Sequence, residues 1–363
     1  MTDEQKALAA LAALAETCAA AKLALDAAPT PRADVPPLAV LRKDYLALLT
    51  LLYTNTTKAS LVLRPSAPVP RAALAPLAEL AKHVSALTTC ATLFDAHGRT
   101  LAADARRHAA DLVAHVRAFA EALQAQDDPA STAFLVRTGA VHDAVEQIRA
   151  QLPTDNRAAV QRRLAGDREM LADCLEEVQE MAKEGAGEED EDEDDWGDED
   201  GLDELGLGAS KPLSDAERLR AKRCGELMKC TCMLHKKILR DLQSQVFKDA
   251  ANPILDALPS HSHELLLASE DLVASLYAPQ KPATVLRAVK SIDDRFQDFK
   301  RTLFATTSTS TAVEDLAQKM SKASISEASP SQSTAELPHG YDISYRVLAS
   351  CITKASDEGP PSQ

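Results

Sequence analysis

The chain has 363 residues and a formal net charge of −15, which leaves room for two or three domains or for one large core. Hydrophobic residues make up 45% and aromatic residues only 4%. This composition, rich in Ala and Leu, favours helices and argues against a β-sandwich or barrel. Seven cysteines without a pairing pattern indicate reduced thiols in a cytosolic or nuclear compartment. We find no secretory signal and no run of about 18 uninterrupted apolar residues, so we expect no membrane span.

Apolar residues recur at steps of three and four along most of the chain, which predicts amphipathic helices packed in antiparallel bundles. Thr2 and Gln5 have the spacing of a capping box at the start of the first helix. Proline clusters and Gly98 separate the helices expected before residue 185. The first predicted apolar seam is Leu8, Leu11, Leu14, Cys18 and Leu25, and the second is Leu38, Leu41, Tyr45, Leu48, Leu52, Ala59 and Val62.

An acidic segment interrupts this pattern. From Glu188 to Glu204 the chain carries 13 acidic residues and no basic one, which leaves only −2 of the net charge for the rest. Such a segment cannot bury enough apolar surface to order itself, so we predict a disordered linker. Trp196 within it is a candidate protein-binding residue, because acidic residues around one aromatic side chain resemble short binding motifs. The alternative is a plain solvated linker.

Helical spacing resumes after the acidic segment. Ser214 and Glu217 form a second capping-box signature, and the helix behind them carries a basic stripe, either its solvated face or a surface for a polyanion. His261 and His263 are expected on the surface beside a proline turn. The last predicted seam is Val285, Val289, Ile292, Phe296, Phe299 and Leu303. The predicted domains are an N-terminal bundle (1–184), the acidic linker (185–212), a C-terminal helical region (213–304) and a flexible Ser/Thr-rich tail (305–363).

The sequence contains few signs of an active site. His108 and His115 are seven residues apart, about 10 Å along a helix, so one ion cannot bridge them. There is no His-Glu-x-x-His pattern, no Gly-x-Ser-x-Gly elbow and no glycine-rich phosphate loop. We therefore expect no enzyme activity, no metal, no cofactor and no small-molecule substrate. Nucleic acid is not an expected partner either, because the basic stripe lacks interleaved aromatic residues and a DNA-reading motif.

Several segments together resemble the cyclin-D-binding protein family, also called Grap2-and-cyclin-D-interacting protein. They are YTNTTKASLVLRP at 53–65, FLVRTGAVHDAVEQIRAQLPTDNRAAV at 134–160, and EDLVASLYAP at 270–279, with the acidic segment in between. The resemblance covers about residues 40–303. It implies an all-helical assembly similar to vinculin and talin bundles. It also implies a cytoplasmic and nuclear protein that binds a D-type cyclin, an adaptor or a helix-loop-helix transcription regulator, and that restrains cell-cycle progression and transcription.

Four further residues are candidate protein-binding positions. Asp155 and Asn156 lie in the most family-like stretch, where they are either a partner contact or only the cap of a helix that follows Pro153. Asp271 and Tyr277 belong to the last family-like segment. The function expected is therefore that of a non-enzymatic, protein-binding regulator. A cytoskeletal or adhesion-type helical scaffold is the alternative, and it depends on analogy of fold alone.

Overall fold

The structure is a computed structural model that describes residues 1–29, 34–125, 132–183, 212–244, 247–248 and 250–307. All regular structure within these ranges is helical, which confirms the predicted all-α fold. The acidic segment, Trp196 and the predicted tail beyond Thr307 lie outside the described residues. The helices are α1 (Asp3–Asp26), α2 (Leu38–Val62), α3 (Pro70–Leu93), the 3-10 helix η1 (Phe94–His97), α4 (Arg99–Gln124), α5 (Ala133–Gln151), α6 (Asn156–Lys183), α7 (Asp215–Gln243), α8 (Asn252–Ser275) and α9 (Pro282–Thr307).

Contacts between Cα atoms divide the chain into two compact units, Met1–Val160 and Gln161–Gln363. This division falls inside α6, whereas the predicted domain limit at 184 follows the start of the acidic segment. The first division follows contacts within the folded chain, and the second follows the change in composition along the sequence. The limits of independently folding domains therefore stay a prediction. Each unit is described below by itself.

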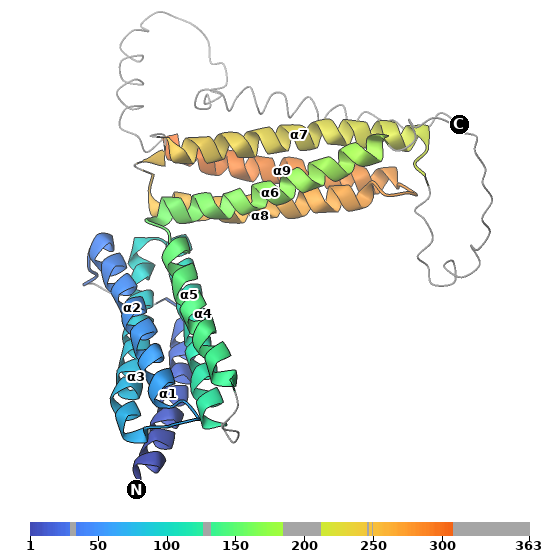
Figure 1. Cartoon of the computed structure of the whole chain (residues 1–363). Helices are drawn as coiled ribbons and strands as arrows, with labels where there is room; N and C mark the ends of the chain where they lie inside the picture. Colours follow the sequence, from blue (N-terminus) through green and yellow to red (C-terminus); the bar gives the residue numbers. More distant parts are fainter. Residues whose placement is uncertain (30–33, 126–131, 184–211, 245–246, 249, 308–363) are drawn as a thin grey trace, which may run out of the picture. The chain divides into compact units, whose positions relative to one another are not determined.

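The first unit is a bundle of α1 to α5 (Figure 1). In it α1 packs on α3 and α4, α2 on α3 and α5, and α4 on α5. Its centre contains the fully buried rings of Tyr45 and Phe94, which meet edge to face at 5.6 Å between centroids. The Tyr45 hydroxyl donates to the backbone oxygen of Ala105 at 3.0 Å and so joins α2 to α4.

The first helix is capped as predicted but buries a different face. Thr2 and Gln5 form the expected reciprocal capping box. The residues of α1 that are buried are Ala7, Leu11, Leu14, Cys18, Ala21 and Leu25. Leu8, which we had placed in this seam, is 46% exposed, because the buried stripe takes alternating steps of four and three that pass through Ala7. By length and composition α1 would also be apolar enough to cross a membrane, but in this structure those six side chains lie in the core of the first unit.

The second unit consists of α6 from Gln161 onward together with α7, α8 and α9, which run alongside one another in Figure 1. The predicted seam of α9 is confirmed from Val285 to Phe299, with each of its five side chains at most 2% exposed. The proline turn expected near His261 is wrong, because α8 begins at Asn252 and continues through Pro259. His261 is half-buried within this helix, and its Nε2 lies 2.9 Å from the Thr302 hydroxyl of α9.

Candidate protein-interaction site

Asp155 and Asn156 both accept hydrogen bonds at the start of a helix. Oδ1 of Asp155 accepts from the backbone N–H of Ala158 at 2.8 Å, as an N-cap residue does in the first turn of α6. The amide oxygen of Asn156 accepts from the backbone N–H of Leu101 at 3.0 Å, in the first turn of α4. Asn156 is only 3% exposed, so its side chain is not on the surface of this structure. These contacts favour the capping interpretation over a partner contact.

Gly98 explains why α4 takes its cap from a distant residue. It occupies the N-cap position of α4 with φ 123° and ψ 138°, a region that only glycine adopts readily. A Cβ atom at this position would lie 2.1 Å from Cγ of Asn156. Gly98 therefore supplies no capping side chain and leaves the space that the Asn156 amide fills. The turn before α6 is also tied to α2, since the Arg42 guanidinium donates to the backbone oxygens of Leu152 and Pro153, each at 3.3 Å.

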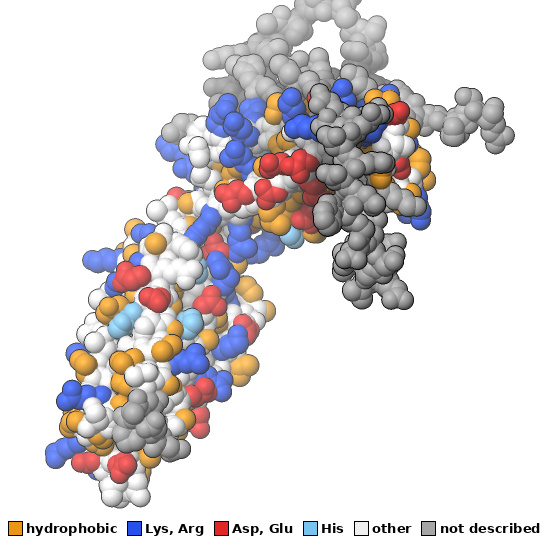
Figure 2. All heavy atoms as spheres, turned by 45° about the vertical axis from the view of Figure 1, so that its right-hand side comes forward, with side chains coloured by type: hydrophobic (Ala, Val, Ile, Leu, Met, Phe, Trp, Pro, Cys, Tyr) orange, Lys and Arg blue, Asp and Glu red, His pale blue; other side chains and the backbone are white. Residues whose placement is uncertain are grey.

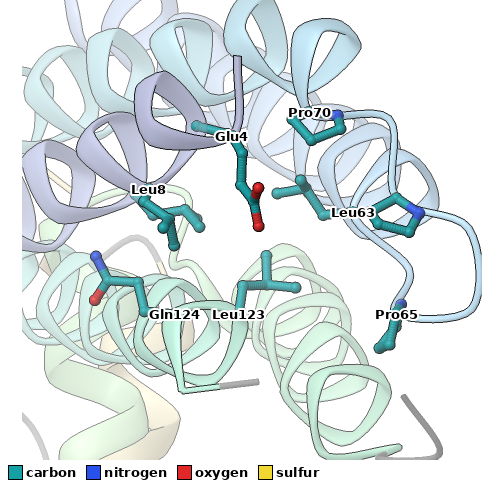
Figure 3. Close-up of a pocket in the computed structure, with 10 residues that line it drawn as sticks. Glu4, Leu8, Leu63, Pro65, Pro70, Leu123 and Gln124 are labelled. Atoms are coloured by element: carbon teal, nitrogen blue, oxygen red, sulfur yellow. The ribbon is translucent and has the colours of Figure 1, made fainter. Parts of the chain in front are cut away.

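A groove of about 480 Å³, lined mostly by Leu and Pro side chains, opens on the first unit (Figure 3). Its walls come from the start of α1, the α2–α3 turn and the end of α4. Figure 3 shows the Glu4 carboxylate pointing between Leu63 and Leu123, and this carboxylate makes no hydrogen bond or ion pair with the described residues. The full lining is Glu4, Ala7, Leu8, Leu11, Leu63, Pro65, Pro68, Pro70, Leu123 and Gln124.

Sequence reasoning missed this groove. In the folded unit the buried stripe of α1 passes through Ala7 and Leu11, which leaves Leu8 beside the stripe and toward solvent, and periodicity alone does not select this face. A proline-rich turn next to an exposed leucine then marks a place where apolar surface stays uncovered. Elsewhere on the first unit, charged and hydrophobic side chains are interspersed on the face seen in Figure 2.

In the second unit Asp271 lies near the end of α8, and Tyr277 lies in the turn that follows this helix. Both are exposed, Tyr277 by 50%, and the Tyr277 hydroxyl donates to the Glu177 carboxylate of α6. The next turn is fixed to α7, because the backbone N–H of Gln280 donates to Oε1 of Glu217 at 2.7 Å. Asp271 and Tyr277 are therefore accessible, and their role in binding stays a prediction.

The second predicted capping box, of Ser214 and Glu217, is confirmed. The Glu217 carboxylate accepts from both the hydroxyl and the backbone N–H of Ser214, at 2.7 and 2.9 Å. The hydroxyl and backbone N–H of Ser214, followed by the backbone N–H of Gln280, lower the pKa of Glu217 below its usual value. This carboxylate therefore joins the start of α7 to the α8–α9 turn in its ionised form.

A polar cluster is buried where α6, α7 and α8 meet. Ser262, which is fully buried, donates its hydroxyl to the Asp167 carboxylate. Nε2 of His235 lies 2.8 Å from Ser262 Oγ, and it must be the donor because the only hydroxyl proton is already used. Burial, and then the nearby Arg168, lower the pKa of His235 to about 4, which keeps the ring neutral at pH 7.

This cluster is not arranged for nucleophilic catalysis. A serine nucleophile must give its proton to the imidazole, but the imidazole here donates to the serine. Ser262 is also closed to any substrate, since it is 0% exposed. The three side chains instead connect three helices of the second unit.

The described residues contain no group of three or more His, Cys, Asp or Glu side chains placed to hold a metal ion. His108 and His115 both line a hollow of about 220 Å³ between α4 and α5, together with Arg107 and Asp111. None of the six described cysteines forms a disulfide, and all but Cys232 are buried.

The fold and surface of the described residues define an all-helical bundle protein that presents a groove lined mostly by Leu and Pro side chains, and charged helix faces. Two family models match the chain: "Grap2 and cyclin-D-interacting, N-terminal" over residues 45–184 and "Grap2 and cyclin-D-interacting, C-terminal" over residues 189–301. The chain belongs to the Grap2 and cyclin-D-interacting family, as its sequence segments indicated.

A relative from Xenopus laevis, the cyclin-D1-binding protein 1 homolog, is 31% identical over 199 residues. The match covers 53% of this chain and 58% of the relative, so it spans less than two thirds of the relative's length. The family supports a role in protein interaction for this chain. The likeness to vinculin and talin bundles stays a prediction.

Proposed function

We propose that this protein is a non-enzymatic regulator that binds a D-type cyclin and thereby restrains cell-cycle progression and transcription. The observation that carries the proposal is the match of the family models across both helical units, over residues 45–184 and 189–301. The name of the Xenopus laevis relative, which refers to binding of cyclin D1, points to the same partner. Among the described residues, the buried cluster of His235, Ser262 and Asp167 most resembles a catalytic site. Its hydrogen bonds support a structural role for these three side chains rather than catalysis.

The groove at Glu4 is the contact surface that we assign to the cyclin. An apolar partner that covered the Glu4 carboxylate without compensation would bury an unpaired charge, at a cost of several kcal/mol. The occupant should therefore present apolar side chains to Leu8 and Leu63 and a Lys or Arg to Glu4. The volume of about 480 Å³ is sufficient to enclose a few side chains, since pockets for small ligands span about 300–1,000 Å³.

Calorimetric titration of the full chain with a purified D-type cyclin tests both statements. Leu8→Lys places a cation in the groove, and Leu23→Lys is the matched control because Leu23 lies on the same helix, is 74% exposed and is not part of the groove lining. We expect the Leu8 variant to bind at least tenfold more weakly and the Leu23 variant to bind like the wild type. No binding by the wild type would reject the proposed function. Equal binding by all three proteins would reject only the groove.

We propose that the protein acts in both cytoplasm and nucleus and that a helix-loop-helix transcription regulator is a second partner. Imaging of a fluorescent fusion tests the location, and the same titration with such a regulator tests the partner. Loss of the protein should change cell-cycle timing. Altered actin attachment with unchanged cell-cycle timing would instead favour a cytoskeletal scaffold.

A further inference from the structure

The outer face of α7 carries a straight row of exposed residues at alternating steps of three and four. We call this row the α7 stripe. Its members lie along one line of the helix, because steps of three and four return to the same face. All seven are exposed: Leu219, Lys222, Glu226, Lys229, Met233, Lys236 and Arg240.

The cations of the α7 stripe have no partner among the described residues. Lys222, Lys229, Lys236 and Arg240 make no ion pair or side-chain hydrogen bond there. The neighbouring Lys237 differs, since its ammonium lies 3.0 Å from the Asp241 carboxylate. Lys and Arg side chains also gather on the second unit in Figure 2. Four unpaired cations and one anion give the stripe a local charge of about +3, which attracts a negatively charged partner.

The spacing and composition of the stripe favour a protein helix over nucleic acid. Lys222, Lys229 and Lys236 follow at intervals of seven residues, about 10 Å at 1.5 Å per residue, which is the repeat of side chains on a facing helix. Phosphates along one nucleic-acid strand are much closer, about 3.4 Å apart along the duplex axis. Glu226 would repel a phosphate chain, and no aromatic residue in the stripe could stack with a base.

Two apolar residues of the α7 stripe would contact the apolar face of an amphipathic partner helix. Leu219 and Met233 are 48% and 51% exposed and lie in line with the lysines. A partner helix with acidic side chains opposite the lysines and apolar ones opposite Leu219 and Met233 would contact the whole row. We propose that the α7 stripe binds an acidic amphipathic helix of another protein, in which Glu or Asp recurs every seven residues. This surface does not depend on the cyclin proposed above, which we assign to the first unit.

Fluorescence anisotropy with the full chain tests the proposal directly. The probe is a labelled helical peptide of three heptads with Glu at the d positions and Leu at the a positions. Two further probes are a scrambled peptide of the same composition and a single-stranded DNA of 20 nucleotides. We expect the patterned peptide to bind most tightly, and its affinity to fall as salt is raised because the contacts are exposed ion pairs.

Neutralising the stripe should weaken this binding. The variant Lys222→Gln, Lys229→Gln, Lys236→Gln removes three ion pairs, and we expect about a tenfold loss of affinity from exposed pairs of this kind. The matched control is Lys58→Gln, Arg64→Gln, Arg71→Gln, which removes three exposed cations from the first unit and should bind like the wild type. Circular dichroism verifies that both variants keep their helical content.

Several results would overturn the proposal. They are no binding of the patterned peptide by the wild type, equal binding by the neutralised variant, equal binding of the scrambled peptide, or tighter binding of the DNA. The chain's own residues 188–204 are the remaining possible occupant. If deletion of these residues raises the affinity for the peptide about tenfold, the stripe serves the chain's own acidic segment and not a second protein.

Discussion

Replacement of Asn156 by Ala tests the cap that one helix receives from another. The change removes the amide oxygen that accepts from the backbone N–H of Leu101 and leaves that N–H in a buried place. Loss of a capping side chain costs about 1 kcal/mol, and a buried donor without a partner costs about 1–3 kcal/mol. We expect the free energy of unfolding to fall by about 2 kcal/mol.

A double-mutant cycle with Gly98→Ala separates the contact between position 98 and the Asn156 amide from a general loss of stability. In the wild-type background Gly98→Ala combines backbone strain at φ 123°, about 1–3 kcal/mol, with an overlap against the Asn156 amide that adds about 1–3 kcal/mol. The three atoms nearest to the added Cβ all belong to the Asn156 amide, and Asn156→Ala removes them. Gly98→Ala should therefore cost about 1–3 kcal/mol less in the Asn156→Ala background.

Urea denaturation of the full chain, followed by circular dichroism, gives the free energies, and hydrogen exchange reports on the first turn of α4. Thr132→Ala is the control, because Thr132 stands at the N-cap of α5 without a side-chain capping bond. It should leave stability and exchange unchanged. The reasoning is refuted if Asn156→Ala behaves like this control, or if Gly98→Ala costs the same in both backgrounds.

Three more outcomes follow from the described contacts. Asp155→Ala should lower stability by about 1 kcal/mol and the melting temperature by about 2–4 °C, with cyclin binding at low temperature unchanged in calorimetry. Ser262→Ala should cost more than Ser269→Ala in urea denaturation, by about 1–3 kcal/mol. The Ser262 hydroxyl joins α8 to α6 and α7, whereas the Ser269 hydroxyl donates only to the backbone oxygen of Leu265 in its own helix. The pKa of His235 is lowered from 6.5 to about 4, so the unfolded chain binds more protons between these values, and stability should fall by up to about 3 kcal/mol as the pH drops from 6.5 to 4. Unfolding of His235→Phe measured across this range should show a flatter dependence on pH, and an unchanged slope would contradict the assignment.

Local signals in the sequence were sufficient for most of the helices and for the core face of α9 from Val285 to Phe299; the side chain of Leu303, also predicted in this seam, lies outside the described residues. The spacing of Val285 to Phe299 predicted five buried side chains, since aromatic and β-branched residues leave little doubt about which face is apolar. Thr2 and Gln5 predicted the first helix start, because a capping box involves only residues three apart. In α1 the same reasoning selected Leu8 in place of Ala7. A helix made largely of Ala and Leu is apolar on more than one face, so periodicity alone does not select the buried one.

Features that depend on contacts between distant residues could not be predicted from the sequence. The proline turn predicted beside His261 is wrong, since α8 passes through Pro259. A proline inside a helix disturbs one turn, while burial of Leu255 and Leu258 against the rest of the second unit offsets that loss. The bond from Leu101 to Asn156 joins residues 55 positions apart, and nothing near Gly98 indicates where its cap comes from. The groove at Glu4 likewise arises from three segments that meet only in the folded first unit.

Hydrogen bonds between helices explain how helices of such uniform composition pack in one register along their axes. Faces of Ala and Leu look alike one turn apart, so apolar packing discriminates weakly between registers shifted by about 5.4 Å. In the first unit the Tyr45 hydroxyl bonds to Ala105, and the hydroxyls of Thr138 and Ser60 lie within hydrogen-bond distance, 3.0 Å apart, between α5 and α2. A shift by one turn would break each bond and leave a buried polar group without a partner, at about 1–3 kcal/mol apiece. A few polar positions therefore select the arrangement that the apolar residues stabilise, and that arrangement in turn brings together the residues that line the groove.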